Sequence, residues 1–305
     1  MNDELLMQRC LQLAALGGGY VSPNPMVGAV VVYGDRIIGE GYHKVYGQSH
    51  AEPNAINSVS DKSLLKDSTL YVNLEPCCHW GKTPPCADFI VECGIKKVVI
   101  CNSDPNPKVA GGGVKILKDG GIEVVTGVLE KSGRELNKRF FSRHERNRPY
   151  IILKWAQTLD GYMDVERKNN NVEKYWITND ALKLWVHKQR AIEDCILVGK
   201  ETIINDNPKL NIRYYTGPNP IRMTIDKDLM IPKDRFLFDG TQKSVVFNAK
   251  KDLIEGNTTY VKLNFEVGVL EQIIHYIYSD IKTSSLIVEG GKFTLEGFIK
   301  ENLWD

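Results

Sequence analysis

Three separated residues and a neighbouring carboxylate could together do zinc chemistry. His50 and Glu52 lie two residues apart, and Cys77 and Cys86 lie in the run EPCCHWGKTPPC at residues 75–86. One imidazole and two thiolates can hold zinc tetrahedrally and leave a fourth position for water. Glu52 is close enough to His50 in the sequence to exchange protons with that water. The pattern therefore predicts a catalytic zinc site, because a structural site would have four protein ligands.

The spacing of these residues follows that of zinc-dependent base deaminases, with one departure. Those enzymes show H-x-E followed by P-C-x-x-C, and their glutamate transfers protons without binding the metal. Here eight residues separate Cys77 from Cys86, so a loop is inserted inside the motif. Cys78 and His79 lie in this loop and remain alternative ligands. Four other cysteines lie in apolar periodic runs and are expected in the core: Cys10, Cys93, Cys101 and Cys195.

The elements around the motif predict how its residues are positioned. Residues 3–16 form an apolar helical stripe, and residues 26–33 and 36–41 read as a hairpin joined by Gly34-Asp35. Pro53 fits the first turn of a helix that begins near His50. A strand over 69–74 leads to Cys77, and a helix opens at Cys86. Because both thiols then lie near a positive helix end, we expect lowered pKa values for both.

Further strands at 97–101 and 123–126 extend the pattern to βαβαβ, so the first half is expected to be a layered α/β domain. We place its end at residue 145 and interpret the charged run 139–148 as a solvated connector. A second domain, 146–305, begins with the strand 150–154. Near its end, a strand over 285–288, the turn Glu289-Gly290-Gly291-Lys292 and a helix over 294–300 could cradle a phosphate. No G-x-G-x-x-G follows an early strand, so a Rossmann domain is not indicated.

Composition narrows the range of partners. The 305 residues include 39 Lys plus Arg and 38 Asp plus Glu, and this balance favours neither nucleic acid nor an anionic membrane. No apolar run is long enough to span a bilayer, and the N-terminus is acidic where a signal peptide would be basic. Seven cysteines, an odd number, fit a reducing compartment, so we expect a cytoplasmic protein. The oligomeric state stays open, with a homo-oligomer among the alternatives.

The run LEPCCHWGKTPPC resembles the zinc loop of the bifunctional deaminase/reductase family of riboflavin biosynthesis. The resemblance extends to PNPMVG at 23–28, HAE at 50–52 and DPNP at 104–107, and it continues through KWAQTLDG at 154–161 and VEGG at 288–291. It implies a cytidine-deaminase-like three-layer α/β/α domain, followed by a dihydrofolate-reductase-like α/β domain. The family continues beyond the point where this chain ends, so we expect the last strands of the reductase sheet to be missing.

The resemblance also implies residue roles, with Zn²⁺ and NADPH as cofactors and pyrimidine ribosyl phosphates as substrates. His50, Cys77 and Cys86 bind zinc and Glu52 is catalytic. The deaminase substrate contacts Asn24, His43, His79 and Lys82. The reductase substrate contacts Lys174, Arg190, Leu210, Arg213 and Glu289, with the two arginines as a phosphate clamp. The cofactor contacts Ala156, Trp176, Thr202, Asp206, Lys227, Gly291, Lys292, Phe293, Thr294, Leu295, Glu296 and Gly297. Lys154 and Asp160 are further candidates for the reductase site.

The expected function is zinc-dependent deamination of 2,5-diamino-6-(5-phosphoribosylamino)pyrimidin-4(3H)-one, followed by NADPH-dependent reduction of its ribosyl group to ribityl. Three alternatives remain. The second domain could be a binding or dimerisation remnant beside an active deaminase. The first domain could edit nucleic-acid bases, although the charge balance does not suggest a strand-binding surface. The chain could also be a zinc-stabilised interaction module without activity, against which Glu52 and the open coordination position argue.

Overall fold

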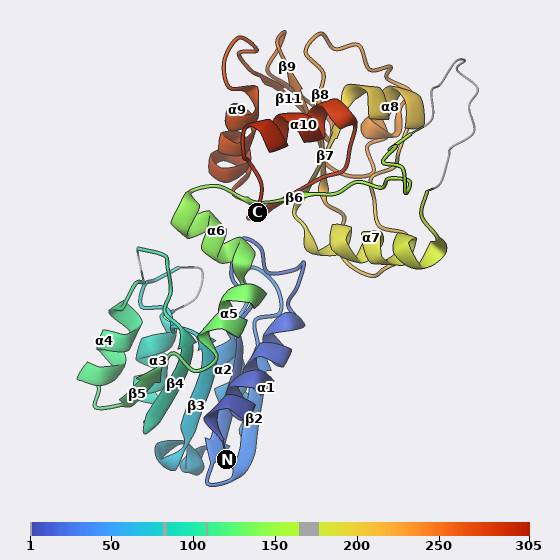
Figure 1. Ribbon diagram of the computed structural model, residues 1–305. Helices are drawn as coiled ribbons and strands as arrows, with labels where there is room; N and C mark the ends of the chain where they lie inside the picture. Colours follow the sequence, from blue (N-terminus) through green and yellow to red (C-terminus); the bar gives the residue numbers. More distant parts are fainter. Residues whose placement is uncertain (1, 82–83, 108, 165–176) are drawn as a thin grey trace. The chain divides into compact units, whose positions relative to one another are not determined.

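The computed structural model describes residues 2–81, 84–107, 109–164 and 177–305. The chain divides into two compact units, Met1–Arg146 and Asn147–Asp305. Each unit is an α/β structure built on a sheet of its own (Figure 1). No helix in the described part of the chain is both long and apolar enough to cross a membrane.

The sheet of the first unit has the order β2-β1-β3-β4-β5 among its described strands. Strand β1 pairs antiparallel with β2 and β3, whereas β3, β4 and β5 run parallel, so the expected hairpin and βαβαβ order are confirmed. Gly34 in the hairpin turn has φ +55°, which glycine adopts without strain. The strands are β1 (Gly28–Tyr33), β2 (Arg36–Tyr42), β3 (Thr69–Leu74), β4 (Lys97–Asn102) and β5 (Glu123–Thr126).

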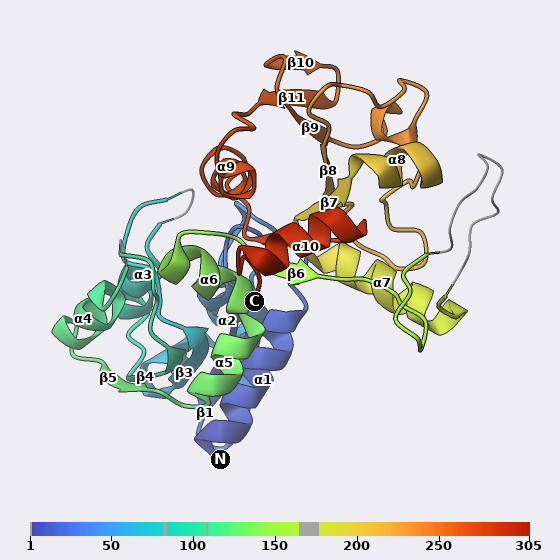
Figure 2. The same ribbon diagram turned by 45° about the horizontal axis from the view of Figure 1, so that its top comes forward.

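Helices cover both faces of this sheet, which gives the expected three layers. The helices are α1 (Asp3–Ala15), α2 (Ala51–Ser58), α3 (Cys86–Glu92), α4 (Gly112–Asp119), α5 (Glu130–Leu136) and α6 (Lys138–Arg146). Side chains of α2, α3 and α4 pack with Val31 and Val72 on one face. On the other face, α1 packs with Val30 and Val32, and α5 lies beside α1 (Figure 2). Continuous apolar runs such as Val30–Val32 suit a sheet buried on both faces.

Helix α2, which contains Glu52 in its first turn, packs very closely on β2. A Cβ atom on Gly41 would lie 2.3 Å from the backbone nitrogen of Ala55 and 2.6 Å from the carbonyl carbon of Asn54. We therefore expect Gly41→Ala to push α2 off the sheet and to cost about 1–3 kcal/mol of folding free energy. Urea unfolding of the variant would measure this loss. Stability equal to that of the wild type would contradict the close packing of α2 on β2.

The charged run at the end of the first unit is a helix, so the interpretation of 139–148 as a solvated connector was wrong. Residues Lys138–Arg146 form α6, and Phe140 and Phe141 are buried in a cluster with Leu74. The charged residues of the run hid this amphipathic pattern, because two adjacent phenylalanines do not by themselves show a helical period. Helix α6 is thus part of the folded first unit.

The second unit is built on a sheet with the order β10-β11-β9-β8-β7-β12-β6 in the part of the chain that the structure describes. Its strands are parallel except for the β10–β11 hairpin. The strands are β6 (Tyr150–Leu153), β7 (Cys195–Gly199), β8 (Ile221–Ile225), β9 (Ser244–Asn248), β10 (Leu253–Glu255), β11 (Thr258–Lys262) and β12 (Ser285–Val288). The helices are α7 (Asp180–Ile192), α8 (Lys200–Asp206), α9 (Val269–Tyr276) and α10 (Lys292–Lys300).

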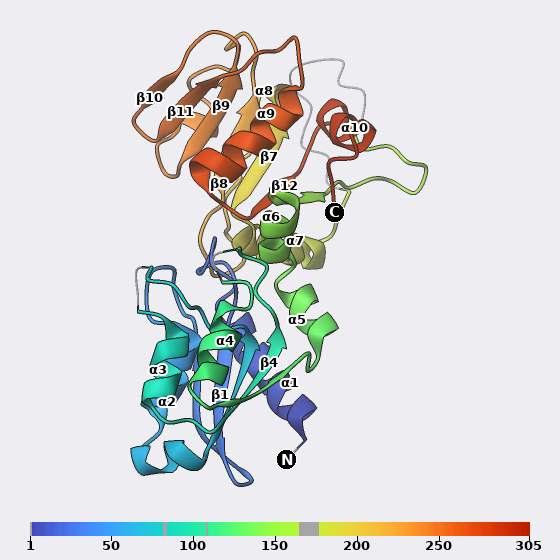
Figure 3. The ribbon, with the colours of Figure 1, turned by 90° about the vertical axis from the view of Figure 1, so that its left-hand side faces the viewer.

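Two hydrophobic clusters hold this second sheet. Helices α9 and α10 pack through Ile273, Leu295 and Phe298 on one face, and Figure 3 shows α9 lying across the strands. On the other face, Ile203 of α8 packs with Ile196 and Val198 of β7. At the edge strand β6, the backbone N–H of Asp305 donates a 3.0 Å hydrogen bond to the carbonyl of Ile151.

Candidate active sites

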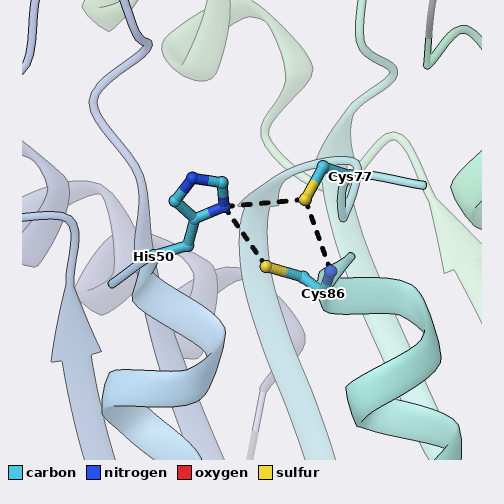
Figure 4. A group of neighbouring side chains, drawn as sticks. All are labelled: His50, Cys77 and Cys86. Carbon is cyan, nitrogen blue, oxygen red and sulfur yellow. Dashed lines mark hydrogen bonds between the residues drawn. The ribbon is translucent and has the colours of Figure 1, made fainter. Parts of the chain in front are cut away.

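The three predicted zinc ligands lie together at the start of two helices. His50 is the N-cap residue of α2, and Cys86 is the first residue of α3. Cys77 follows β3, and its side chain points toward those of His50 and Cys86 (Figure 4). The His50 Nδ1 atom lies 3.3 Å from the Sγ of Cys86 and 3.6 Å from the Sγ of Cys77. All three ligand atoms fall within 4.8 Å of one another.

This arrangement fits a zinc ion. With Zn–S near 2.3 Å and Zn–N near 2.05 Å, tetrahedral geometry places nitrogen and sulfur ligands about 3.6 Å apart. The two nitrogen-to-sulfur distances are close to that value. Thiolate and imidazole ligands also favour zinc over the hard cations, which prefer oxygen. Three protein ligands leave a fourth position, which is typical of catalytic sites.

The alternative ligands Cys78 and His79 are not members of this cluster. The thiol of Cys78 donates to the carbonyl of Val109 at 3.8 Å. It also lies 2.7 Å from the position that a Cβ on Gly112 would take, so it packs against the start of α4. The geometry therefore favours Cys77 and Cys86 as the two thiol ligands.

Replacement of one cysteine at a time separates these assignments. We expect Cys86→Ser to lose bound zinc, with a drop in metal affinity of at least 10-fold, because an alcohol replaces a thiolate ligand. Cys78→Ser is the matched control and should keep one zinc per chain. Metal analysis after dialysis measures both. Zinc lost from the Cys78 variant and kept by the Cys86 variant would reverse the assignment.

The two thiols have opposite pKa shifts. A hydrogen bond from the Cys86 thiol, together with His50 and the Cys86 backbone N–H, lowers the pKa of Cys77 to about 4. The same thiol pair and burial raise the pKa of Cys86 well above its usual value. The expected lowering of both values thus holds for Cys77 alone. Before a cation binds, the pair shares one proton, and a bound cation favours the second thiolate.

Glu52 is placed to handle protons beside the ligands. It lies in the first turn of α2 and is 3% exposed. Burial raises the pKa of its carboxyl to about 7, and the nearby Cys77 thiolate adds to this rise. Glu52 is absent from the ligand cluster. A carboxyl that changes its protonation state near neutral pH is suited to general acid and base catalysis.

A cavity of about 560 Å³ opens onto the cluster and is lined by three of the predicted substrate residues, Asn24, His43 and His79. The fourth, Lys82, lies outside the described residues. The Nδ1 of His43 is 3.1 Å from the carbonyl of Ser49, which can only accept, so this nitrogen carries the proton. Its Nε2 therefore accepts from the Asn24 amide at 3.2 Å. Both ring nitrogens have protein partners, so we expect His43 to orient Asn24.

Sequence reasoning missed several residues of the cavity wall. Glu75 accepts hydrogen bonds from the backbone N–H groups of Asp104, Gly111 and Val114 at 3.1–3.2 Å, so it holds the loop that precedes α4. The glutamate of the Glu-Pro-Cys run was the available signal. Arg143 and His144 of α6 also line the cavity. They were missed because the run around them was interpreted as a connector.

In the second unit, Arg190 and Glu289 form a buried pair. Arg190 donates from Nε and Nη2 to the two carboxylate oxygens of Glu289, at 2.8 and 2.6 Å. Lys154 lies 3.6 Å from the same carboxylate. The structure thus brings together three predicted reductase residues. It also gives the donor fork of Arg190 a different partner from the expected phosphate, because two of its donors are directed at Glu289.

The other predicted substrate residues are spread around this pair. Arg213 is exposed and donates to the Asn211 side chain at 2.5 Å, and its backbone N–H donates to His187 at 3.0 Å. Sequence reasoning missed His187, whose pKa is lowered to about 4 by burial and by the two arginines. Leu210 is 2% exposed and its side chain is in the core. Lys174 lies outside the described residues.

The strand, glycine turn and helix expected for the phosphate cradle are present at the end of β12. Gly290 has φ +150°, and the N–H of Gly291 donates to the Thr202 hydroxyl at 3.3 Å. A Cβ on Gly199 would lie 2.8 Å from the hydroxyl oxygen of Thr294, so β7, the turn and α10 pack closely. This tight glycine turn before α10 fits a phosphate group, whose approach to the backbone needs such a turn.

The remaining predicted cofactor residues are not all directed to this turn. Leu295 is in the core, and Lys227 lines a separate hollow near Asp252 and Phe265. Asp160 accepts from Thr158 at 2.5 Å in the segment after β6. Trp176 lies outside the described residues. Asp206 ends α8, Ala156 follows β6, and Lys292, Phe293, Glu296 and Gly297 belong to α10.

A three-layer α/β/α unit with a His-Cys-Cys cluster and a buried glutamate defines a zinc-dependent deaminase. Residues 1–102 match the family model "Cytidine and deoxycytidylate deaminase zinc-binding region". Residues 149–305 match "RibD C-terminal domain". The chain belongs to the RibD family of riboflavin biosynthesis proteins, bifunctional enzymes that join a deaminase to a reductase.

Individual relatives match nearly the whole chain. Riboflavin biosynthesis protein RibD of Aquifex aeolicus is 40% identical over 99% of this chain and 85% of its own length. A crystal structure of a diaminohydroxyphosphoribosylaminopyrimidine deaminase/5-amino-6-(5-phosphoribosylamino)uracil reductase from Thermotoga maritima is 39% identical, with a TM-score of 0.88 over 98% of this chain and 84% of that one. RibD of Acinetobacter baumannii is 32% identical, with a TM-score of 0.89 over 99% and 84%.

Proposed function

We propose that the unit Met1–Arg146 removes the amine from 2,5-diamino-6-(5-phosphoribosylamino)pyrimidin-4(3H)-one. We propose further that the unit Asn147–Asp305 reduces the ribosyl group of the product to ribityl with NADPH. The observation that carries the first step is the cluster of His50, Cys77 and Cys86 beside buried Glu52, open to a cavity of about 560 Å³. Family membership and the names of the relatives support the second step.

In the deamination, His50, Cys77 and Cys86 would hold a zinc ion, which would supply Lewis-acid activation of a water molecule. Glu52 takes a proton from the attacking water and returns it to the departing amine, so ammonia leaves as a neutral molecule. Asn24, whose amide is held by His43, would hydrogen-bond the polar edge of the pyrimidine. The walls of the cavity would orient the pyrimidine ring against the attacking water.

In the reduction, the turn at Gly290 and Gly291 would hold a phosphate of NADPH, and this cofactor would supply the hydride that reduces the ribosyl group. Lys154 and Arg190 both lie beside the Glu289 carboxylate, so this group holds two cations close together in the proposed reductase site. Arg213, exposed beyond them, is suited to the substrate phosphate.

The test follows both products in one reaction. Zinc-loaded protein is mixed with the phosphorylated diaminopyrimidinone and NADPH, and ammonia release and NADPH absorbance are recorded together. We expect ammonia to form first and NADPH to be consumed afterwards. Ammonia without NADPH oxidation would contradict the reductase assignment, and no ammonia from zinc-loaded protein would contradict the substrate assignment.

A further inference from the structure

Among the described residues, those that line the cavity at the zinc cluster include more carboxyl groups than arginine or lysine side chains, although the proposed substrate is an anion. Three carboxyl groups line it, those of Glu52, Glu75 and Asp104. Among the lining residues that the structure describes, Arg143 carries the one side chain that stays positively charged at every physiological pH. A dianionic phosphate that enters this space needs such a charge, because each carboxyl group that is ionised repels it at close range.

Helix α6 holds Arg143 in a fixed position. Phe140 and Phe141 are buried, and the Arg134 guanidinium lies 4.2 Å from the centre of the Phe141 ring. The same Arg134 binds both carboxylate oxygens of Glu145, at 2.9 and 2.7 Å. Helix α6 is therefore attached to the first unit by the buried side chains of Phe140 and Phe141. Arg134 of α5 adds two further contacts, one with the Phe141 ring and one with the Glu145 carboxylate.

The face of α6 that meets the cavity is made of three residues at helical spacing. Phe140, Arg143 and His144 stand at positions i, i+3 and i+4, which share one side of a helix. All three line the cavity. The His144 ring packs edge-on against Phe140, with 4.6 Å between the ring centres, so this face is ordered by contacts within the helix as well.

A second wall of the cavity has an unsatisfied polar atom. The Nδ1 of His79 is buried and has no hydrogen-bond partner among the described residues. A buried polar atom without a partner costs free energy unless a ligand or water satisfies it. His79 lies in the loop between Cys77 and Cys86, and both His79 and Arg143 of α6 line this cavity.

We propose that Arg143 binds the phosphate group of the deaminase substrate, and that α6 thereby selects phosphorylated over unphosphorylated pyrimidine ribosides. This inference rests on the proposed deamination and adds a residue to it. The planar guanidinium fork can give two parallel hydrogen bonds to phosphate oxygens. Arg143 lies 57 positions beyond Cys86 in the chain, outside the zinc-binding motif, so motif spacing alone does not reveal it.

The test compares two substrates in the zinc-loaded protein. Arg143→Ala should raise KM for the phosphorylated diaminopyrimidine riboside by roughly 10- to 100-fold, the range for a lost hydrogen bond to a charged group. Its kcat should stay within about twofold, and its KM for the same riboside without phosphate should equal that of the wild type. Arg143→Lys should lie between the two because it keeps the charge and loses the fork.

Arg146→Ala is the matched control, because it removes the same charge from an exposed position of the same helix. It should leave both KM values unchanged. Equal loss on both substrates, or an unchanged KM in Arg143→Ala, would overturn the inference while ammonia release by the wild type upholds the deaminase assignment. No ammonia from the wild type on either substrate would overturn the proposed function and this inference with it.

Discussion

Replacement of Glu52 by Gln is expected to slow ammonia release by about 10²- to 10⁴-fold, the usual contribution of a positioned general acid and base. Glutamine has nearly the same shape but cannot take a proton from water or return it to the amine. Because Glu52 is 3% exposed, a smaller residue would leave a gap, and Gln keeps the volume. The measurement is kcat for ammonia release from zinc-loaded protein.

Two controls show whether the loss is chemical. The variant should keep one zinc per chain, because Glu52 is not one of the three clustered ligands. It should also oxidise NADPH at the wild-type rate when it is given the deaminated pyrimidine directly, since that step is assigned to the second unit. Ammonia release at a tenth of the wild-type rate or faster would exclude Glu52 as the main proton carrier.

The buried pair of Arg190 and Glu289 is expected to make a large contribution to the stability of the second unit. Glu289→Gln should destabilise the second unit by about 3–5 kcal/mol, because Arg190 and Lys154 then lack their shared carboxylate in a site that is largely shielded from water. The side chains of Arg190 and Glu289 are only 13% and 5% exposed. Hydrogen exchange of the amides in β7 and β12 measures this loss in the second unit itself.

An exposed ion pair serves as a control that separates the effect of burial on stability from the effect of losing a charge. The Nη2 of Arg134 donates to both carboxylate oxygens of Glu145, at 2.9 and 2.7 Å, but the two side chains are 43% and 42% exposed. Glu145→Gln should therefore cost less than about 1 kcal/mol. The double variant Arg190→Leu/Glu289→Leu should recover part of the loss, because it leaves fewer unpaired buried charges. A loss for Glu289→Gln no larger than that for Glu145→Gln would contradict the burial argument.

The Arg190–Glu289 pair also makes the stability of the second unit depend on pH. Burial opposes the ionisation of Glu289, but the hydrogen bonds and charge of Arg190, with Lys154, hold the pKa of this carboxyl below its usual value. A lowered pKa in the folded state means that the stabilisation is present above the unfolded value of about 4.3 and is lost as the pH falls below it. The wild type should lose stability in this acidic range more steeply than Glu289→Gln.

Local patterns predicted the strands and the zinc cluster because their signals are short-range. The hairpin around Gly34 and the strand over 285–288 follow from alternating or continuous apolar runs beside turn residues. The cluster followed from His50, Cys77 and Cys86, since few other functions need these residue types at this spacing. Helix α6 did not follow, because its apolar contacts depend on Leu74, far away in the sequence.

The sequence by itself determined the chemistry of the first site, because metal ligands and a proton carrier must be particular residue types and two short segments contain them all. Tertiary structure alone decided which side chains meet across the chain. It joined Arg190 to Glu289, 99 positions apart, and brought Arg143 to the cavity of the zinc cluster. These pairings depend on how helices pack on the sheets, and no local period or spacing encodes that packing.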